Sequence, residues 1–144
     1  MIKRILVTGG GGLVGGALHS LAHEYSPREL MFLRLKDCDL RSLDAATNFV
    51  KAREPDAIIH LAALSGGIEL SAKHPATLLR DNVLMNFNVL EAARLCRVRK
   101  VVMTLSSGMY PAEAPNPILE EYIHDGGPHQ SNYGYAFAKR LVDP

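Results

Sequence analysis

Two residues near the end of the chain, Tyr135 and Lys139, have the types and the spacing that proton transfer requires. In a helix, residues four apart lie on one face, so their side chains are neighbours. An ammonium beside a phenol favours the ionised phenol and lowers its pKa, which lets the tyrosine donate or accept a proton. Many structural helices carry such a pair by chance, so the pair needs support from other residues.

Ser106 gives that support, because it follows an apolar run at residues 100–105 that predicts a buried strand. Ligands bind at the carboxyl edge of the sheet in open α/β folds, and a serine hydroxyl there can hold a substrate carbonyl against Tyr135. Ser107 is the second candidate for the same role. Together with Lys139, these residues predict a site that moves a proton at a carbonyl group.

A glycine-rich segment, TGGGGLVGG, begins at Thr8. Its glycines fit two spacings, Gly9-x-x-Gly12-x-x-Gly15 and Gly10-x-Gly12-x-x-Gly15. A buried strand leads into the run and an amphipathic helix from Leu13 leads out of it, which is the context that a dinucleotide pyrophosphate needs. We therefore predict a cofactor-binding turn, and the alternative is a purely structural turn.

The second predicted strand ends beside two cations, Arg34 and Lys36. An NAD-preferring enzyme commonly carries an acidic residue here, whereas the 2′-phosphate of NADP calls for a cation. Arg34 can form a forked contact with a phosphate and Lys36 can add a point charge, which favours NADP. The alternative is that both are solvated surface cations. Asp39 and Leu40 are better placed to meet the adenine edge than the ribose.

The elements that must position these residues alternate between strand and helix. Apolar runs predict strands at residues 5–8, 30–35, 57–62 and 100–105. Helical spacing predicts helices at residues 13–24, 43–54, 75–93 and 132–142, with Ser42 as an N-cap, Pro75 at a helix start, and breaks at Ser26-Pro27 and Pro55. This alternation favours right-handed βαβ crossovers and a parallel sheet covered on both faces, so the predicted class is α/β.

The composition excludes several classes of protein. A length of 144 residues with 47% hydrophobic residues allows one domain with a core. The chain has 16 Lys+Arg and 15 Asp+Glu, so no broad positive electrostatic field would attract nucleic acid or a membrane surface. No long apolar stretch occurs, so we expect a soluble, cytoplasmic protein. Cys38 and Cys96 match neither a metal pattern nor a disulfide framework.

These motifs resemble the extended short-chain dehydrogenases/reductases and, within them, the GDP-L-fucose synthases. The resemblance spans almost the whole chain and rests on VTGGGGLVGGA, KDCDL, HLAALSGGI, DNVLMNFNVLEAA, LSSGMYP and IHDGGPHQSNYGYAFAKRLVD. The glycine turn and the Tyr/Lys pair are shared by the superfamily, whereas HLAALSGGI and HDGGPHQSNYGYAFAKR are more particular. The resemblance implies an NADP-binding Rossmann-type domain over residues 1–144. It also implies NADPH-dependent epimerisation and reduction of GDP-4-keto-6-deoxy-D-mannose to GDP-L-fucose, by an enzyme that forms homodimers at full length.

The resemblance also implies roles for individual residues. Ser106, Tyr135 and Lys139 would form the catalytic triad. The cofactor would contact Gly9, Gly12, Leu13, Val14, Gly15, Arg34, Lys36, Asp39, Leu40, Ala62, Ala63, Tyr135 and Lys139. The GDP-sugar would contact Ser65, Gly66, Gly67, Ser106 and Ser107, with His129 and Asn132 as further candidates. Asn82 is similar to a family asparagine near the active site, or is a helix-interior amide satisfied by backbone. No metal is implied.

One position departs from the family pattern, because Gly108 stands where the motif has a cysteine that takes part in epimerisation. Glycine has no ionisable group, so one arm of a two-base epimerisation is missing. The histidine partner, the rest of the sheet and the substrate lobe would lie beyond Pro144. We therefore expect about four strands with the outer edge of the fourth unpaired, and weak NADP binding without turnover of a GDP-sugar.

Two other interpretations stay open. The first is another extended enzyme of nucleotide sugars, such as a 4-epimerase or a 4,6-dehydratase, which would keep the same catalytic triad. The second is a non-catalytic module that binds NADP or a protein partner. Gly108 favours the second interpretation, and the intact pair of Tyr135 and Lys139 counts against it.

Overall fold

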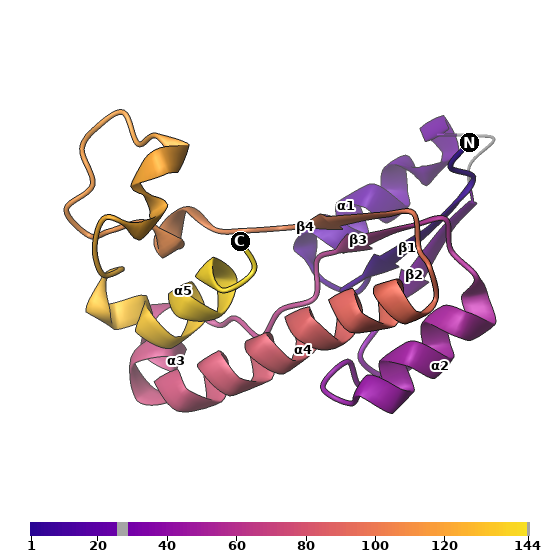
Figure 1. The fold of residues 1–144 in the computed structure, drawn as a ribbon, viewed down its shortest axis with the longest axis horizontal. Helices are drawn as coiled ribbons and strands as arrows, with labels where there is room; N and C mark the ends of the chain where they lie inside the picture. Colours follow the sequence, from indigo (N-terminus) through magenta and orange to yellow (C-terminus); the bar gives the residue numbers. More distant parts are fainter. Residues whose placement is uncertain (26–28, 144) are drawn as a thin grey trace. The chain divides into compact units, whose positions relative to one another are not determined.

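The computed structural model describes residues 1–25 and 29–143, so the predicted break at Ser26-Pro27 lies outside the described residues. The chain is an α/β protein, as predicted (Figure 1). Its strands are β1 (Arg4–Thr8), β2 (Glu29–Leu33), β3 (Ala57–His60) and β4 (Lys100–Met103). Its α-helices are α1 (Leu13–Leu21), α2 (Leu43–Arg53), α3 (Gly67–Lys73), α4 (Pro75–Leu95) and α5 (Tyr133–Arg140). Short 3₁₀ turns are Ala22–Tyr25, Ser107–Met109, Glu120–His124 and Gln130–Asn132.

The chain divides into two compact units. The first unit comprises Met1–Ala63 with Leu84–Thr104, and the second comprises Leu64–Val83 with Leu105–Pro144. All the described strands lie in the first unit, and α3 and α5 lie in the second. The prediction of one domain over residues 1–144 stays a prediction. In the described part of the chain, no helix is long and apolar enough to span a bilayer.

The sheet of the first unit is parallel, with the order β2-β1-β3-β4 among the described strands. The chain winds outward in one direction to β2 and in the other direction to β3 and β4. Loops that leave the carboxyl ends of β1 and β3 therefore diverge, and such a switch point is where open α/β sheets bind ligands. The glycine turn follows β1, and Ala62 and Ala63 follow β3.

Helices lie against both faces of this sheet. The α2 and α4 side holds the hydrophobic core, which consists of Leu6, Leu33, Leu40, Ala46, Val50, Ile58, Met85, Val89, Ala92 and Ala93. On the α1 side, the ring of His19 meets the ring of Phe32 edge-on, with 4.9 Å between the ring centres. No described strand pairs with the outer side of β4, and Val102 on it is 44% exposed. The unpaired edge agrees with the prediction.

The predicted strands are confirmed; β1 ends at Thr8 as predicted, and the other three end two residues earlier than predicted. β2 ends at Leu33 because Arg34 and Asp37 form a turn, in which the Arg34 N–H donates to the Asp37 carboxylate at 3.0 Å. In the same turn the Asp37 N–H donates to the Arg34 carbonyl at 2.9 Å. β3 ends at His60 and β4 ends at Met103. Where a strand ends depends on its backbone hydrogen bonds, which apolarity does not reveal.

The predicted helix boundaries agree closely with the structure. The Ser42 hydroxyl accepts from the Ala45 N–H at 3.3 Å, so the predicted N-cap of α2 is confirmed. α2 ends where Glu54 adopts a left-handed φ of 45°, just before Pro55. α1 gives way to the 3₁₀ turn Ala22–Tyr25 instead of continuing as an α-helix to residue 24.

The second unit holds a helix that the sequence did not predict, α3. Two glycines at its start indicated a loop, and seven residues are too few to show helical periodicity. α5 packs closely on the start of α4 through Gly134. A Cβ on Gly134 would lie 2.8 Å from the carbonyl carbon of Pro75 and closer still to its oxygen.

Candidate functional site

α5 places Tyr135 and Lys139 on one helix face, as their spacing predicts. The Nζ of Lys139 lies 5.9 Å from the centre of the Tyr135 ring. Lys139 is buried, with 2% of its surface exposed, and Tyr135 is partly buried. Burial of an ammonium costs free energy, so a buried lysine in a short helix is more typical of a functional site than of a surface helix.

The electrostatics of this pair differ from the sequence-based expectation. Burial raises the pKa of Tyr135 above its ordinary value of 10.0. Burial also lowers the pKa of Lys139 below its ordinary value of 10.5. The expectation that the ammonium lowers the pKa of the phenol is therefore wrong for this structure, because desolvation disfavours both charged forms. Tyr135 keeps its proton, which suits a proton donor.

Ser106 is held by the 3₁₀ turn that it caps. Its Oγ accepts from the N–H of Gly108 at 3.2 Å, and its own hydroxyl hydrogen can still be donated. The turn Ser107–Met109 packs against α5. The side chain of Ser107 is exposed and the turn does not hold it in this way, so the geometry favours Ser106 for the predicted role.

A buried arginine ties this turn to α5. Arg140 donates from Nε and Nη2 to the carbonyl of Met109, and from Nη1 to the carbonyl of Gly126 at 2.8 Å. These bonds fix the segment between β4 and α5 at two points. Arg140 was not among the predicted site residues, because no sequence motif distinguishes it from a surface arginine next to Lys139.

Gly108 and Asn132 are neighbours. A Cβ on Gly108 would lie 2.8 Å from the Nδ2 of Asn132 and 3.5 Å from the Oγ of Ser106. The Oδ1 of Asn132 accepts from the Ser71 hydroxyl at 3.2 Å. Asn132 therefore lies beside Ser106, whereas the Nδ1 of His129 caps the turn Gln130–Asn132 by accepting from a backbone N–H.

Asn82 is satisfied by backbone, which was one of the two interpretations of its sequence. Its Oδ1 accepts from the Leu64 N–H at 2.8 Å, and its Nδ2 donates to the carbonyls of Leu64 at 2.9 Å and Leu78 at 2.7 Å. It thereby anchors the segment of the predicted sugar-contacting residues, Ser65, Gly66 and Gly67. These residues are exposed; Gly66 is the N-cap of α3 and Gly67 is its first residue.

The glycine turn lies in the first unit and requires its glycines. Gly9 has a left-handed φ of 70°, and a Cβ there would lie 2.7 Å from the backbone nitrogen of Ala62. The Gly12 N–H donates to the Gly9 carbonyl at 2.9 Å. Gly15 is buried, and a Cβ on it would lie 2.7 Å from the Cα of Gly10. Gly10 is crowded as well, because a Cβ on it would lie 2.8 Å from the Cβ of Phe32, so both predicted spacings stay open.

The N-terminus of α1 fits a pyrophosphate. Gly12 is the N-cap and supplies no side-chain hydrogen bond, so the first N–H groups of the helix are left for another acceptor. Leu13 is 94% exposed and Val14 is 55% exposed at this end of the helix. Bare backbone at a helix N-terminus is the arrangement that binds phosphate.

Arg34 lies beside this turn, since its Cγ is 3.8 Å from where a Cβ of Gly11 would stand. Lys36 is exposed in the same loop. Asp39 is engaged by Arg41, which donates at 2.7 Å and lowers the pKa of the carboxyl to about 2 through its side-chain hydrogen bonds. The sequence analysis missed Arg41. The side chain of Leu40 packs into the core, so the predicted contact with the adenosine end would fall to its backbone and stays a prediction.

A buried hydrogen-bond chain connects β1, β3 and α4 within the first unit. The Ala62 N–H donates to the Thr8 hydroxyl at 3.2 Å, and that hydroxyl lies 2.7 Å from the Nδ1 of His60. The Nε2 of His60 lies 3.1 Å from the Oδ1 of Asn86. These hydrogen bonds hold the Ala62–Ala63 segment beside the glycine turn. His60 is buried and contacts a polar atom at each ring nitrogen, so its role is structural.

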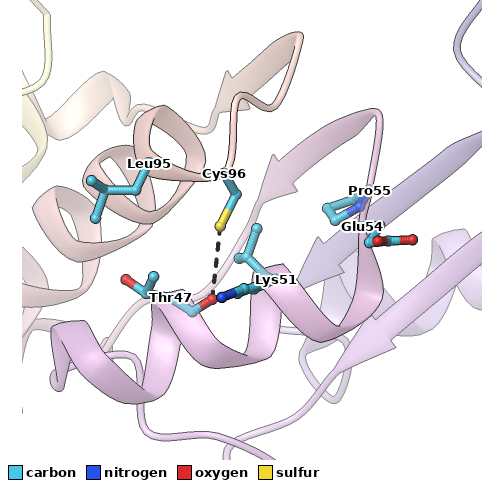
Figure 2. Close-up of a pocket in the computed structure, with 7 residues that line it drawn as sticks. Thr47, Lys51, Glu54, Pro55, Leu95 and Cys96 are labelled. Carbon is cyan, nitrogen blue, oxygen red and sulfur yellow. Dashed lines mark hydrogen bonds between the residues drawn. The ribbon is translucent and has the colours of Figure 1, made fainter.

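A separate cavity of about 550 Å³ lies between α2 and the end of α4 (Figure 2). It is lined by Thr47, Val50, Lys51, Glu54, Pro55, Leu95 and Cys96. Pro55 precedes β3, so this cavity lies at the amino edge of the parallel sheet, opposite the edge where the glycine turn lies. It is therefore not part of the candidate site. Cys38 and Cys96 are free thiols.

The chain matches the NAD dependent epimerase/dehydratase family over residues 5–144. It is 46% identical to a probable GDP-L-fucose synthase of Drosophila melanogaster, covering 99% of this chain and 45% of that protein. A GDP-L-fucose synthetase from Naegleria fowleri bound to NADP superposes with a TM-score of 0.88 at 38% identity, covering 98% and 42% of the two chains. A GDP-mannoheptose C4 reductase from Campylobacter jejuni with NADP bound gives 0.90 at 27% identity, covering 97% and 44%. The chain spans less than half the length of the curated relative.

Proposed function

Because the chain belongs to the NAD dependent epimerase/dehydratase family, we propose that it carries the NADP-binding and proton-donating residues of a GDP-L-fucose synthase. The observation that supports this most directly is the burial of Lys139 beside Tyr135 on α5. Burial of an ammonium costs free energy, and a carbonyl reductase needs a cation beside its proton donor. The substrate is a GDP-linked 4-keto sugar.

Tyr135 supplies the proton. Burial keeps its phenol protonated, so the hydroxyl can donate to the ketone oxygen as negative charge develops on that oxygen. The Ser106 hydroxyl, oriented by its bond from Gly108, donates a hydrogen bond to the same oxygen. When the phenol has given up its proton, the ammonium of Lys139 stabilises the phenolate. NADPH, when bound, supplies the hydride.

The cofactor preference depends on the loop after β2. Arg34 and Lys36 present two exposed cations beside the glycine turn, and a 2′-phosphate is the feature that separates NADP from NAD. Both relatives of known structure named above were solved with NADP bound. NADPH should therefore bind more tightly than NADH.

A second candidate function is reduction without epimerisation. Gly108 offers no acid or base beside Ser106, and an epimerisation at a carbon next to a ketone needs one. The similarity to a GDP-mannoheptose C4 reductase is consistent with this narrower activity. Product analysis separates the two functions, because reduction alone leaves the configuration of the neighbouring carbons unchanged.

Titration of the chain with NADPH and with NADH, followed by protein fluorescence, tests the cofactor part of the proposal. We expect NADPH to bind, and steady NADPH oxidation with GDP-4-keto-6-deoxy-D-mannose to be absent, because the chain spans less than half of its relative. Failure to bind NADPH would contradict the proposal. For the whole protein we also propose a cytoplasmic location and a homodimer, on the family resemblance.

A further inference from the structure

The loop between β2 and α2 mixes cations with carboxylates. It carries Arg34, Lys36, Asp37, Asp39 and Arg41, which are three cations against two carboxylates and give a net charge of +1. An ionised carboxylate near the adenosine ribose suits the 2′-hydroxyl of NAD and repels the 2′-phosphate of NADP. Without Arg41 the net charge of this loop would be zero, so the carboxylates would cancel the attraction for a phosphate.

Arg41 grips the carboxylate of Asp39 from three directions. Its backbone N–H donates to Oδ1 at 3.0 Å, its Nε donates to Oδ1 at 2.9 Å, and its Nη2 donates to Oδ2 at 2.7 Å. These bonds lower the pKa of Asp39 to about 2, so the carboxylate is ionised at neutral pH. Its negative charge is therefore permanent, and the guanidinium that offsets it is fixed in place by the forked geometry.

The residue between these two partners is anchored to the first unit. Leu40 is 5% exposed in the hydrophobic core, and its carbonyl accepts from the Nδ2 of Asn88 at 2.9 Å. Asp39 and Arg41 flank this anchor, so their backbone positions follow from that of Leu40. The pair therefore stays in the loop that carries Arg34, whose Cγ lies beside the glycine turn.

We infer that Arg41 determines cofactor specificity by compensating the charge of Asp39, which lets Arg34 and Lys36 dominate the electrostatic field toward a 2′-phosphate. This inference rests on the proposed NADP-binding function and deepens it. Arg41 acts through Asp39, in contrast to the forked phosphate contact proposed for Arg34. Asp39 is then the residue that would disfavour NADP if its charge were not offset.

The test is fluorescence titration of the 144-residue chain with NADPH and with NADH at low salt. In Arg41→Ala the ratio of NADPH affinity to NADH affinity should fall by about threefold, the size expected of one unit charge that acts through solvent. Asp39→Asn should raise the ratio by a similar factor. Arg41→Ala combined with Asp39→Asn restores the net charge of the loop, so the ratio should return to that of the unmodified chain.

Two further variants and the salt concentration serve as controls. Arg41→Lys keeps the charge without the fork and should keep the ratio. Arg94→Ala is the matched control, because Arg94 grips Glu91 through Nε and Nη2 at 2.7 Å each, near the end of α4 at the amino edge of the sheet. It should leave the ratio unchanged. High salt should reduce the differences between the variants, because it screens exposed charges.

Three results would overturn the inference and leave the proposed function in place. The first is an unchanged ratio in Arg41→Ala. The second is a double variant that stays as weak for NADPH as Arg41→Ala, since Arg41 would then contact the phosphate directly. The third is an equal loss of both cofactors in Arg41→Ala, which would show a structural role. Failure of the unmodified chain to prefer NADPH would overturn the inference together with the cofactor part of the proposed function.

Discussion

Thr8 and His60 meet through a 2.7 Å contact between the threonine hydroxyl and the imidazole Nδ1, at the buried carboxyl ends of β1 and β3. The Thr8 oxygen also accepts from the Ala62 N–H at 3.2 Å. The Nε2 of His60 lies 3.1 Å from the Oδ1 of Asn86, which can only accept a hydrogen bond. Together these contacts fix the segment after β3.

The first prediction concerns Thr8→Val, which keeps the shape of the side chain and removes the hydroxyl. The Ala62 N–H and the His60 ring each lose a partner, so the free energy of unfolding should fall by about 1–3 kcal/mol. NADPH affinity should fall several-fold, because the Ala62 segment is no longer held against Gly9. Urea denaturation and NADPH titration measure the two effects.

Two variants control this prediction. Thr8→Ser keeps the hydroxyl and should restore NADPH affinity. Thr47→Val removes a buried hydroxyl that has no hydrogen-bond partner in the structure, so stability and affinity should be unchanged or slightly improved. Equal effects of Thr8→Val and Thr47→Val would show that the hydrogen bonds of Thr8 contribute nothing specific.

The second prediction is that Arg34→Ala separates the two cofactors. The guanidinium lies beside the glycine turn, where it can form a forked contact with a 2′-phosphate that NADH lacks. NADPH affinity should fall by about tenfold or more, and NADH affinity should stay nearly the same. Fluorescence titration with both cofactors measures this. Lys51→Ala, at the opposite edge of the sheet, is the control, and an equal loss for both cofactors would contradict a phosphate contact.

The third prediction compares alanine substitutions at two helical glycines, one of which should raise the stability of the chain and the other lower it. Alanine is favoured over glycine in a helix interior by about 1 kcal/mol, and a Cβ on Gly16 would meet nothing within 4 Å, so Gly16→Ala should stabilise the chain. A Cβ on Gly134 would collide with the carbonyl of Pro75, so Gly134→Ala should destabilise it by about 1–3 kcal/mol. Thermal unfolding of both variants measures the difference, and stabilisation by Gly134→Ala would show that the packing of α5 on α4 is loose.

The features that the sequence predicted well are those whose signals are local. β1, the glycine turn and α1 are contiguous, so periodicity and glycine spacing sufficed to locate them. Tyr135 and Lys139 needed only a helix between them. The roles of Thr8 and His60 were missed because the two residues are 52 positions apart and only the pairing of β1 with β3 joins them.

The same reasoning explains why two features of the second unit were not predicted correctly. Ser71 lies on α3, whose initial glycines indicated a loop, so its contact with Asn132 could not be anticipated. The expected lowering of the pKa of Tyr135 by the ammonium of Lys139 was wrong because sequence spacing says nothing about burial. Contacts and solvent exposure depend on the tertiary fold, and local pattern does not contain them.

The last prediction concerns the pH dependence that the buried ammonium of Lys139 imposes. Its pKa is lower in the folded chain than the ordinary value of 10.5, so at intermediate pH the unfolded chain binds more protons than the folded chain. Stability must then rise with pH, from the lowered pKa of the folded state up to the pKa of the unfolded state. Lys139→Met removes this contribution. The free energy of unfolding of the unmodified chain, relative to Lys139→Met, should therefore increase as the pH rises toward the ordinary lysine pKa of 10.5.

Urea denaturation of both chains at a series of pH values measures this difference, with Lys51→Met as a control that removes an exposed ammonium. The range stays below pH 10, because burial raises the pKa of Tyr135 and its ionisation costs stability only above its ordinary value of 10.0. A difference that falls with pH would mean that a partner stabilises the Lys139 ammonium by more than burial destabilises it. In that case Lys139 would be a charged anchor of the fold, and its role behind Tyr135 would need another explanation.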